Sequence, residues 1–184
     1  HAEWRLSKSA AGTLVALVPD NADIIRGLLN WVTGGFFVQQ LEAIQLLGKA
    51  KCPELLDEVV QTLLKLVEDT TGGEQSALAV AAVDALAQLG QSSESIVTKF
   101  IDIILAGDAA DAATDDVPLQ AAALNAIALM DDPPKQLSSL VNRVLLSSEG
   151  LSYMLWEPCA KALRAMVDKE VAKEKAALVA SGRG

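Results

Sequence analysis

Apolar residues recur along most of this chain at the three-and-four spacing of an α-helix. Between positions 55 and 67, pairs of apolar residues alternate with short polar stretches, which places the apolar side chains on one helix face. No stretch alternates strictly between apolar and polar residues in the way of a half-buried strand. The pattern therefore predicts an all-α protein with nine helices, at residues 2–17, 20–33, 36–50, 54–69, 74–90, 94–106, 117–130, 135–148 and 151–179.

Prolines separate or interrupt several of the predicted helices. Residues 19–21 read Pro-Asp-Asn and should open the second helix. Cys52 precedes Pro53 at a turn, and we therefore expect its thiol to be partly exposed. Pro158 lies early in the last predicted helix. Because proline cannot donate the helical hydrogen bond, it should bend that helix or mark its true start, with residues 151–156 as a separate turn.

One seven-residue pattern occurs four times. It reads apolar, polar, Ala, Ile or Leu, two variable positions and a large apolar residue, at residues 41–47, 83–89, 124–130 and 160–166. The central Ile or Leu positions are 42, 41 and 36 residues apart, and each copy follows another amphipathic helix. The repeating unit is therefore a helix pair. A small side chain suits a close crossing of two helices, and we expect this role for the motif alanines, Ala43, Ala85, Ala126 and Ala162.

These helix pairs resemble the HEAT repeat. That family joins a Leu-rich first helix to a second helix reading Ala-x-x-Ala-Leu-Gly-x-Leu, and residues 55–69 and 81–90 are similar to these two helices. The Val-Arg pair of the family is replaced here, for example by Phe36-Phe37, which places the repeats in the divergent HEAT-like or armadillo-like class. The resemblance implies a right-handed α-α superhelix, or solenoid, of about four helix pairs. An ordinary helical bundle without repeats is the alternative.

The resemblance covers residues 20–168 and implies a domain organisation. Residues 1–19 would form an N-terminal helix that packs on the first repeat. Residues 169–184 would form a charged helical extension and a flexible C-terminus. The four repeats would occupy residues 20–50, 53–91, 93–132 and 134–168.

Composition argues against several classes of function. Hydrophobic residues make up 51% of the chain but aromatic residues only 4%, as in closely packed helices. The 15 basic and 24 acidic residues give a net charge of −9, which lacks the basic footprint of a nucleic-acid module. Residues 1–157 carry a net charge of −12 and residues 158–184 carry +3, so the acidic part would attract basic segments. No run of 18 apolar residues is present, and we expect no membrane span.

Catalytic and metal-binding patterns are also missing from the sequence. The single histidine is residue 1, so no Ser–His or Cys–His pair is expected within the fold. The two cysteines lie 107 positions apart and form no zinc motif. They are expected to be ordinary small hydrophobes of a reducing compartment, with a single disulfide between them as the alternative. The acidic segment at 107–116 lacks the spacing of a calcium loop and is expected to be solvated, with docking of a basic partner as the alternative. We therefore expect no enzyme, no cofactor, no metal and an intracellular location, cytoplasmic or nuclear.

The second helices of HEAT-like solenoids line the concave face, so the resemblance also implies where a partner would bind. The residue before each motif alanine should point away from the core, as should polar residues one turn along. We expect this face to bind an extended peptide or a helix of a partner protein, a basic one in particular; a merely solvated polar face is the alternative. The residues are Glu42, Gln45, Lys49, Asp84, Gln88, Gln91, Asn125, Lys161 and Arg164.

The expected function is that of a scaffold or adaptor segment of a larger intracellular protein. A peptide-gripping transport-receptor or chaperone-cofactor module is a second possibility in the same class. A HEAT-type lyase or other enzyme-associated repeat domain, and a purely structural spacer, are alternatives from other classes. The large aromatic residues are expected in the core with one of the two Phe facing solvent, and would be interaction anchors if exposed: Trp4, Trp31, Phe36, Phe37 and Trp156.

Overall fold

A computed structural model describes residues 2–70, 76–90, 93–106, 117–130, 134, 136–147 and 152–180. All regular elements in these ranges are helices, and the described ranges contain no strand. The all-α expectation is therefore confirmed. The backbone divides into two compact units, His1–Gln91 and Ser92–Gly184, each described below by itself.

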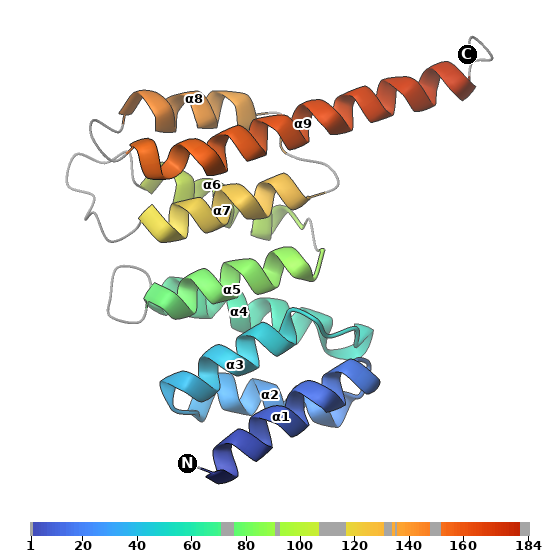
Figure 1. The fold of residues 1–184 in the computed structure, drawn as a ribbon, viewed down its shortest axis with the longest axis vertical. Helices are drawn as coiled ribbons and strands as arrows, with labels where there is room; N and C mark the ends of the chain where they lie inside the picture. The colour runs from blue at the N-terminus through green and yellow to red at the C-terminus, as the bar shows by residue number, and fades with distance from the viewer. Residues whose placement is uncertain are drawn as a thin grey trace. The chain divides into compact units, whose positions relative to one another are not determined.

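The helices follow the expected ranges closely, with no end displaced by more than three residues. Every helix after the first begins and ends where polar, Pro or Gly residues interrupt the apolar spacing. In the first unit (Figure 1) the elements are α1 (Ala2–Leu17), α2 (Ala22–Gly34), α3 (Phe37–Leu47), the short 3-10 helix η1 (Pro53–Leu55), α4 (Leu56–Thr70) and α5 (Ser76–Gln88). In the second unit they are α6 (Glu94–Ala106), α7 (Val117–Leu129), α8 (Leu137–Ser147) and α9 (Ser152–Ala180).

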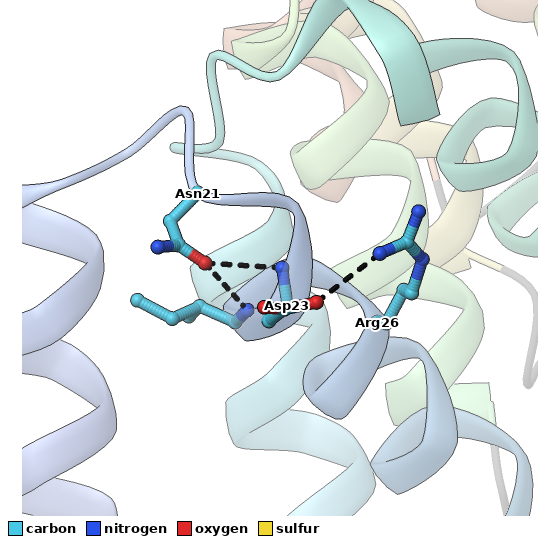
Figure 2. A network of polar contacts seen from close by, with 4 residues as sticks. Asn21, Asp23 and Arg26 are labelled. Atoms are coloured by element: carbon cyan, nitrogen blue, oxygen red, sulfur yellow. Dashed lines mark hydrogen bonds and ion pairs between the residues drawn. The ribbon is translucent and has the colours of Figure 1, made fainter.

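The start of α2 shows how the local sequence fixes a helix end. The side-chain oxygen of Asn21 accepts hydrogen bonds from the backbone N–H groups of Asp23 and Ile24, at 3.0 and 3.2 Å (Figure 2). These bonds satisfy two of the donors that lack a partner at a helix N-terminus. Asp23 in the first turn also forms an exposed ion pair with Arg26, 3.2 Å between Oδ1 and Nη1. Residues 19–21 therefore do open this helix, as the sequence predicted.

The core of the first unit forms where α3 packs against both α2 and α5, and where α4 packs against α5. The motif alanines Ala43 and Ala85 are fully buried there, with exposed fractions of 0% and 1%. The expectation that these alanines face the core is confirmed. The largest fully buried side chains of this unit are Ile25, Ile44, Leu47, Leu63, Leu78 and Leu86.

In the second unit, α7 packs against α6 and α9, and α8 packs against α9 and α6. The motif alanines Ala126 and Ala162 are again fully buried. α7 is covered on most sides and is apolar around nearly its whole circumference, as expected of a central helix. The largest fully buried side chains are Ile96, Phe100, Ile104, Leu119, Leu124 and Ile127.

A glutamine connects two helices in the same way in each unit. Gln40, the fourth residue of α3, donates from Nε2 to the carbonyl of Val32 in the last turn of α2, at 2.9 Å. Gln120, the fourth residue of α7, donates to the carbonyl of Ile104 in the last turn of α6, at 3.3 Å. Both carbonyls belong to the last four of their helices, which lack an intrahelical donor. Each glutamine thus supplies a hydrogen-bond donor from the following helix to a carbonyl at the C-terminal end of the preceding helix.

Of the two alternatives for Pro158, the second is wrong: Pro158 neither starts the last helix nor separates a turn from it, because α9 runs without interruption from Ser152 to Ala180. A bend of α9 at Pro158 stays a prediction. The cost of the hydrogen bond that proline removes is offset by the packing of this part of α9, where Leu155, Cys159 and Ala162 are buried.

Cys52 is buried, with an exposed fraction of 6%, and is not partly exposed. The turn that carries it is held against the preceding part of the unit: the N–H of Lys51 donates to the carbonyl of Pro19 at 2.8 Å, and η1 packs on α2. Long-range contacts of this kind cover a residue that the turn chemistry alone would leave in solvent. The acidic segment 107–116, the side chain of Trp4 and the residue Gln91 lie outside the described residues.

The expected charged extension is helical as far as it is described. α9 continues past α8 in Figure 1, and every residue from Glu170 to Ala180 is exposed. Charged side chains of both signs alternate here with Val and Ala, a pattern typical of a solvent-exposed helix.

Candidate functional site

The neighbouring helices α3 and α5 enclose a groove on the surface of the first unit. From α3 and the turn that follows it come Leu41, Gln45 and Lys49, spaced four residues apart and therefore on one side of the helix. From α5 come four small or branched apolar residues and two polar ones, Ala77, Val80, Ala81, Asp84, Ala85 and Gln88. The groove has a volume of about 340 Å³.

The close approach of the two helices at one end explains the shape of this groove. Gly48 follows α3 and is buried against α5: a Cβ atom on Gly48 would lie 2.9 Å from the Cα of Ala85 and 3.2 Å from its Cβ. Real Cβ atoms essentially never lie closer than 3.0 Å to a neighbouring heavy atom, so a Cβ on Gly48 would force the two backbones to move apart. Small residues at both positions therefore allow backbone contact at this end, while the alanines further along α5 leave space between the helices.

The floor and the rim of the groove differ in chemistry. Ala81 and Ala85 on the floor are buried, with exposed fractions of 8% and 1%. Gln45, Lys49, Asp84 and Gln88 on the rim are exposed. The rim therefore offers two amides, one cation and one carboxylate above a shallow apolar floor. Each amide can donate to and accept from a peptide backbone.

The structure brings together four of the nine predicted binding residues: Gln45, Lys49, Asp84 and Gln88 all line the groove. Glu42 is half-buried on α3 and is not among the lining residues. Asn125 (half-buried, on α7) and Lys161 and Arg164 (exposed, on α9) belong to the second unit. Arg164 lies 4.0 Å from Asp168, between Nε and Oδ2. A single face that carries all nine residues stays a prediction.

Sequence reasoning missed the apolar residues of the groove and a second groove in the other unit. Leu41, Ala77, Val80 and Ala81 were not singled out, although their spacing on α3 and α5 follows from the helix period. The second groove lies between α8 and α9 and measures about 440 Å³. Its signal in the sequence was a pair of valines interleaved with a pair of glutamates at a spacing of four, Val167, Val171, Glu170 and Glu174.

The aromatic residues are more exposed than expected. Phe36, Phe37 and Trp156 have exposed fractions of 83%, 42% and 63%. Phe36 is thus the Phe that was expected to face solvent, while the expectation of a core position is wrong for Phe37 and Trp156. Phe36 occupies the N-cap position of α3, where its backbone N–H donates a hydrogen bond to the side-chain oxygen of Gln39 at 3.0 Å. Its ring therefore extends from a helix end, outside the packed interface of α3 with α2 and α5. Trp31 is half-buried.

The described residues offer little to a metal ion or a nucleophilic reaction. They include no group of three or more His, Cys, Asp or Glu side chains placed to hold a metal. Both cysteines are free and buried, and burial raises the pKa of the Cys159 thiol above its ordinary value. A higher pKa leaves less of the reactive thiolate near neutral pH. No described helix combines the length and the apolar character needed to cross a bilayer.

Comparison of the chain with protein-family models, with curated proteins and with solved structures finds no match. The case for a function therefore depends on the geometry and chemistry of the grooves.

Proposed function

We propose that this chain is a protein-interaction module that binds a segment of a partner protein in the α3/α5 groove. The observation that carries the proposal is the groove itself: four polar residues surround a floor of small apolar residues. An extended segment would place its backbone against the amides of Gln45 and Gln88 and a small apolar side chain on the alanine floor. Asp84 and the net charge of −9 favour a segment with a basic residue.

The proposal includes the HEAT-like architecture. We propose that the helix pairs continue as one right-handed α-α superhelix, which would make the groove one section of a longer binding face. Three observations support this: the motif alanine is buried in all four copies, consecutive helices pack as pairs, and the same glutamine bond recurs at α2/α3 and α6/α7. In this proposal the chain acts as a scaffold or adaptor inside the cell and has no catalytic role.

Peptide selection on the full chain tests the binding site. A random peptide library displayed on phage is selected against the chain, and the affinities of the recovered peptides are measured by calorimetry. We expect basic peptides whose affinity falls about tenfold or more in Asp84→Lys, because the substitution replaces attraction with repulsion at the groove rim. Ala81→Leu, which fills the floor, should weaken the same peptides.

A matched variant shows whether the groove or the general charge is responsible. Asp69→Lys changes an exposed residue of α4 by the same two charges and lies outside the groove lining. It should alter the affinity less than about twofold at physiological salt, where exposed charges are screened. If Asp69→Lys and Asp84→Lys weaken the peptides equally, or if neither does, the groove is not the binding site.

Distances between equivalent motif positions test the superhelix. In a background with both cysteines replaced by Ala, spin labels are placed in pairs at 42 and 125 and at 84 and 161. Both pairs are two repeats apart, so a regular solenoid predicts two similar distances of about 20 Å, given helix separations of about 8–10 Å. Clearly different distances would contradict a regular superhelix and favour a bundle without repeats.

A further inference from the structure

The groove between α8 and α9 differs from the α3/α5 groove in its chemistry. Ser138 near the start of α8 lies on one side, and five residues of α9 form the rest of the lining: Met166, Val167, Glu170, Val171 and Glu174. No Lys or Arg is among these lining residues. The groove is therefore apolar with acidic side chains, and it belongs entirely to the second unit.

Large apolar side chains in this groove are open to water. Val167 and Val171 have exposed fractions of 53% and 42%, although branched side chains of this size are among the residues most often buried. Further along α9, Leu178 is 52% exposed, eleven residues from Val167 and hence close to the same side of the helix. Met166 beside them is half-buried and unbranched, so it can adapt to a partner's side chain. The apolar surface thus continues along the axis of α9.

The two carboxylates that line the groove favour a cationic partner there, although residues 158–184 as a whole carry a net charge of +3. Glu170 and Glu174 are one helical turn apart and both line the groove. The nearby cations of α9 point elsewhere: with a step of about 100° per residue, Lys173 and Lys175 lie roughly 90° or more from the centre of the groove lining. Two cations one turn apart on a partner helix would match the spacing of the two carboxylates.

We propose that the α8/α9 groove binds an amphipathic basic helix of a partner protein. A Leu-sized side chain of that helix enters the groove over Val167 and Val171, and two Lys or Arg residues four positions apart face Glu170 and Glu174. The apolar residues of α9 recur at helical spacing and form a ridge along the helix. Such a ridge can pack between the side-chain rows of the partner helix. This site is separate from the α3/α5 groove and selects its partner by a different pattern of residues.

The test uses a fluorescein-labelled 18-residue synthetic helix with Leu on one face and Lys on the other, titrated into the full chain and followed by anisotropy. We expect the double variant Glu170→Lys/Glu174→Lys to weaken binding about fivefold or more, since exposed ion pairs each contribute modestly. Val171→Ser should weaken binding about threefold or more through lost apolar contact. Circular dichroism of each variant verifies that the helices are retained.

Two controls separate this site from general attraction. Glu157→Lys changes an exposed residue of the same helix outside the groove lining and should change the affinity of the probe less than about twofold at physiological salt. A peptide with the same Lys residues but Gln in place of Leu should bind about tenfold more weakly, because it lacks the apolar face. Equal binding of the two peptides, or unchanged binding by the groove variants, would overturn the proposal.

The experiment also distinguishes this site from the α3/α5 groove and from self-association. Asp84→Lys should leave the affinity of the probe within about twofold of the wild type, as expected of a screened charge outside the lining of the α8/α9 groove. If Asp84→Lys abolishes binding and Glu170→Lys/Glu174→Lys does not, the probe occupies the α3/α5 groove and only the present proposal fails. If sedimentation shows a dimer of the chain that Val171→Ser dissociates, the groove is occupied by a second copy, and the proposed partner helix is wrong.

Discussion

Gly48 and Ala85 bring the ends of α3 and α5 into backbone contact. The backbone of Gly48 is in the ordinary right-handed helical region, with φ −60° and ψ −19°, so its conformation alone does not require glycine. Glycine is required here by the neighbour: a Cβ atom would lie 2.9 Å from the Cα of Ala85. The motif alanine Ala85 of α5 therefore packs against a glycine at the C-terminal end of α3.

This contact predicts opposite effects for two Gly→Ala substitutions in the same unit. Gly48→Ala should lower the free energy of unfolding by about 1–3 kcal/mol, because the methyl group forces the helices apart. Gly27→Ala should raise it by about 0.5–1 kcal/mol, because Gly27 is exposed within α2 and a Cβ there meets nothing within 4 Å. Urea unfolding followed by circular dichroism measures both. Stabilisation by Gly48→Ala would show that the helices separate more easily than their packing indicates.

The buried glutamine of α7 predicts a penalty confined to the second unit. Gln120 has an exposed fraction of 6%, and Gln120→Ala leaves the carbonyl of Ile104 without this donor in a buried position. We expect Gln120→Ala to lower the free energy of unfolding by about 1–3 kcal/mol. Gln40→Ala removes the same kind of bond at a half-buried position and should lower the free energy of unfolding by less.

Thiol labelling under native conditions shows which unit is destabilised by Gln120→Ala, since each unit holds one buried cysteine. Gln120→Ala should accelerate the modification of Cys159 and leave that of Cys52 unchanged, because local opening exposes only the thiol of the weakened unit. Equal acceleration of both thiols would mean that the chain opens as one cooperative unit.

The side chain of Lys169 holds α9 to the end of α7. Its Nζ donates to the carbonyl of Ala128 at 3.2 Å and also to the carbonyl of Met130. A cation at the carbonyl end of a helix is favoured by both the hydrogen bonds and the helix dipole. Lys169→Met should therefore lower the free energy of unfolding by about 1 kcal/mol, or somewhat more. Lys175→Met, at an exposed position of the same helix, should change it by less than about 0.5 kcal/mol, and an equal effect of the two variants in urea unfolding would contradict the assignment.

The buried thiol of Cys159 predicts a loss of stability at alkaline pH. Burial raises its pKa in the folded chain, whereas the unfolded chain has the ordinary thiol value, about 8.5. The stabilising contribution is therefore fully present below that value and is lost as the pH rises through the folded-state pKa. Between pH 8 and 10 the wild type should lose more stability than Cys159→Ala in urea unfolding. Parallel pH profiles of the two proteins would show that the thiol ionises equally easily in both states.

The boundaries of the helices could be predicted from the sequence because they depend on neighbours along the chain. Asn21 supplies the cap of α2 from one residue before the helix, and the apolar spacing of positions 55–67 gives one buried side to α4. The four polar lining residues of the α3/α5 groove were also predictable, since the motif alanine marks the buried side and the helix period gives the positions beside it.

The burial of individual residues was less predictable where it depends on distant parts of the chain. Cys52 is buried because its turn is bonded to the carbonyl of Pro19 through Lys51. Pro158 lies inside a continuous helix because α9 packs against α7 and α8. Neither contact is visible in the residues beside Cys52 or Pro158.

The sequence by itself determined that the chain is helical, where the helices lie and which alanines face inward, because hydrogen bonding within a helix and the spacing of its apolar side are local properties. Only the tertiary structure decided which helices meet, that Gly48 matches Ala85, and that Glu170 and Glu174 lie beside an apolar groove with α8. These features depend on the distance between residues far apart in the chain, and that distance is set by how all the side chains of a unit pack together.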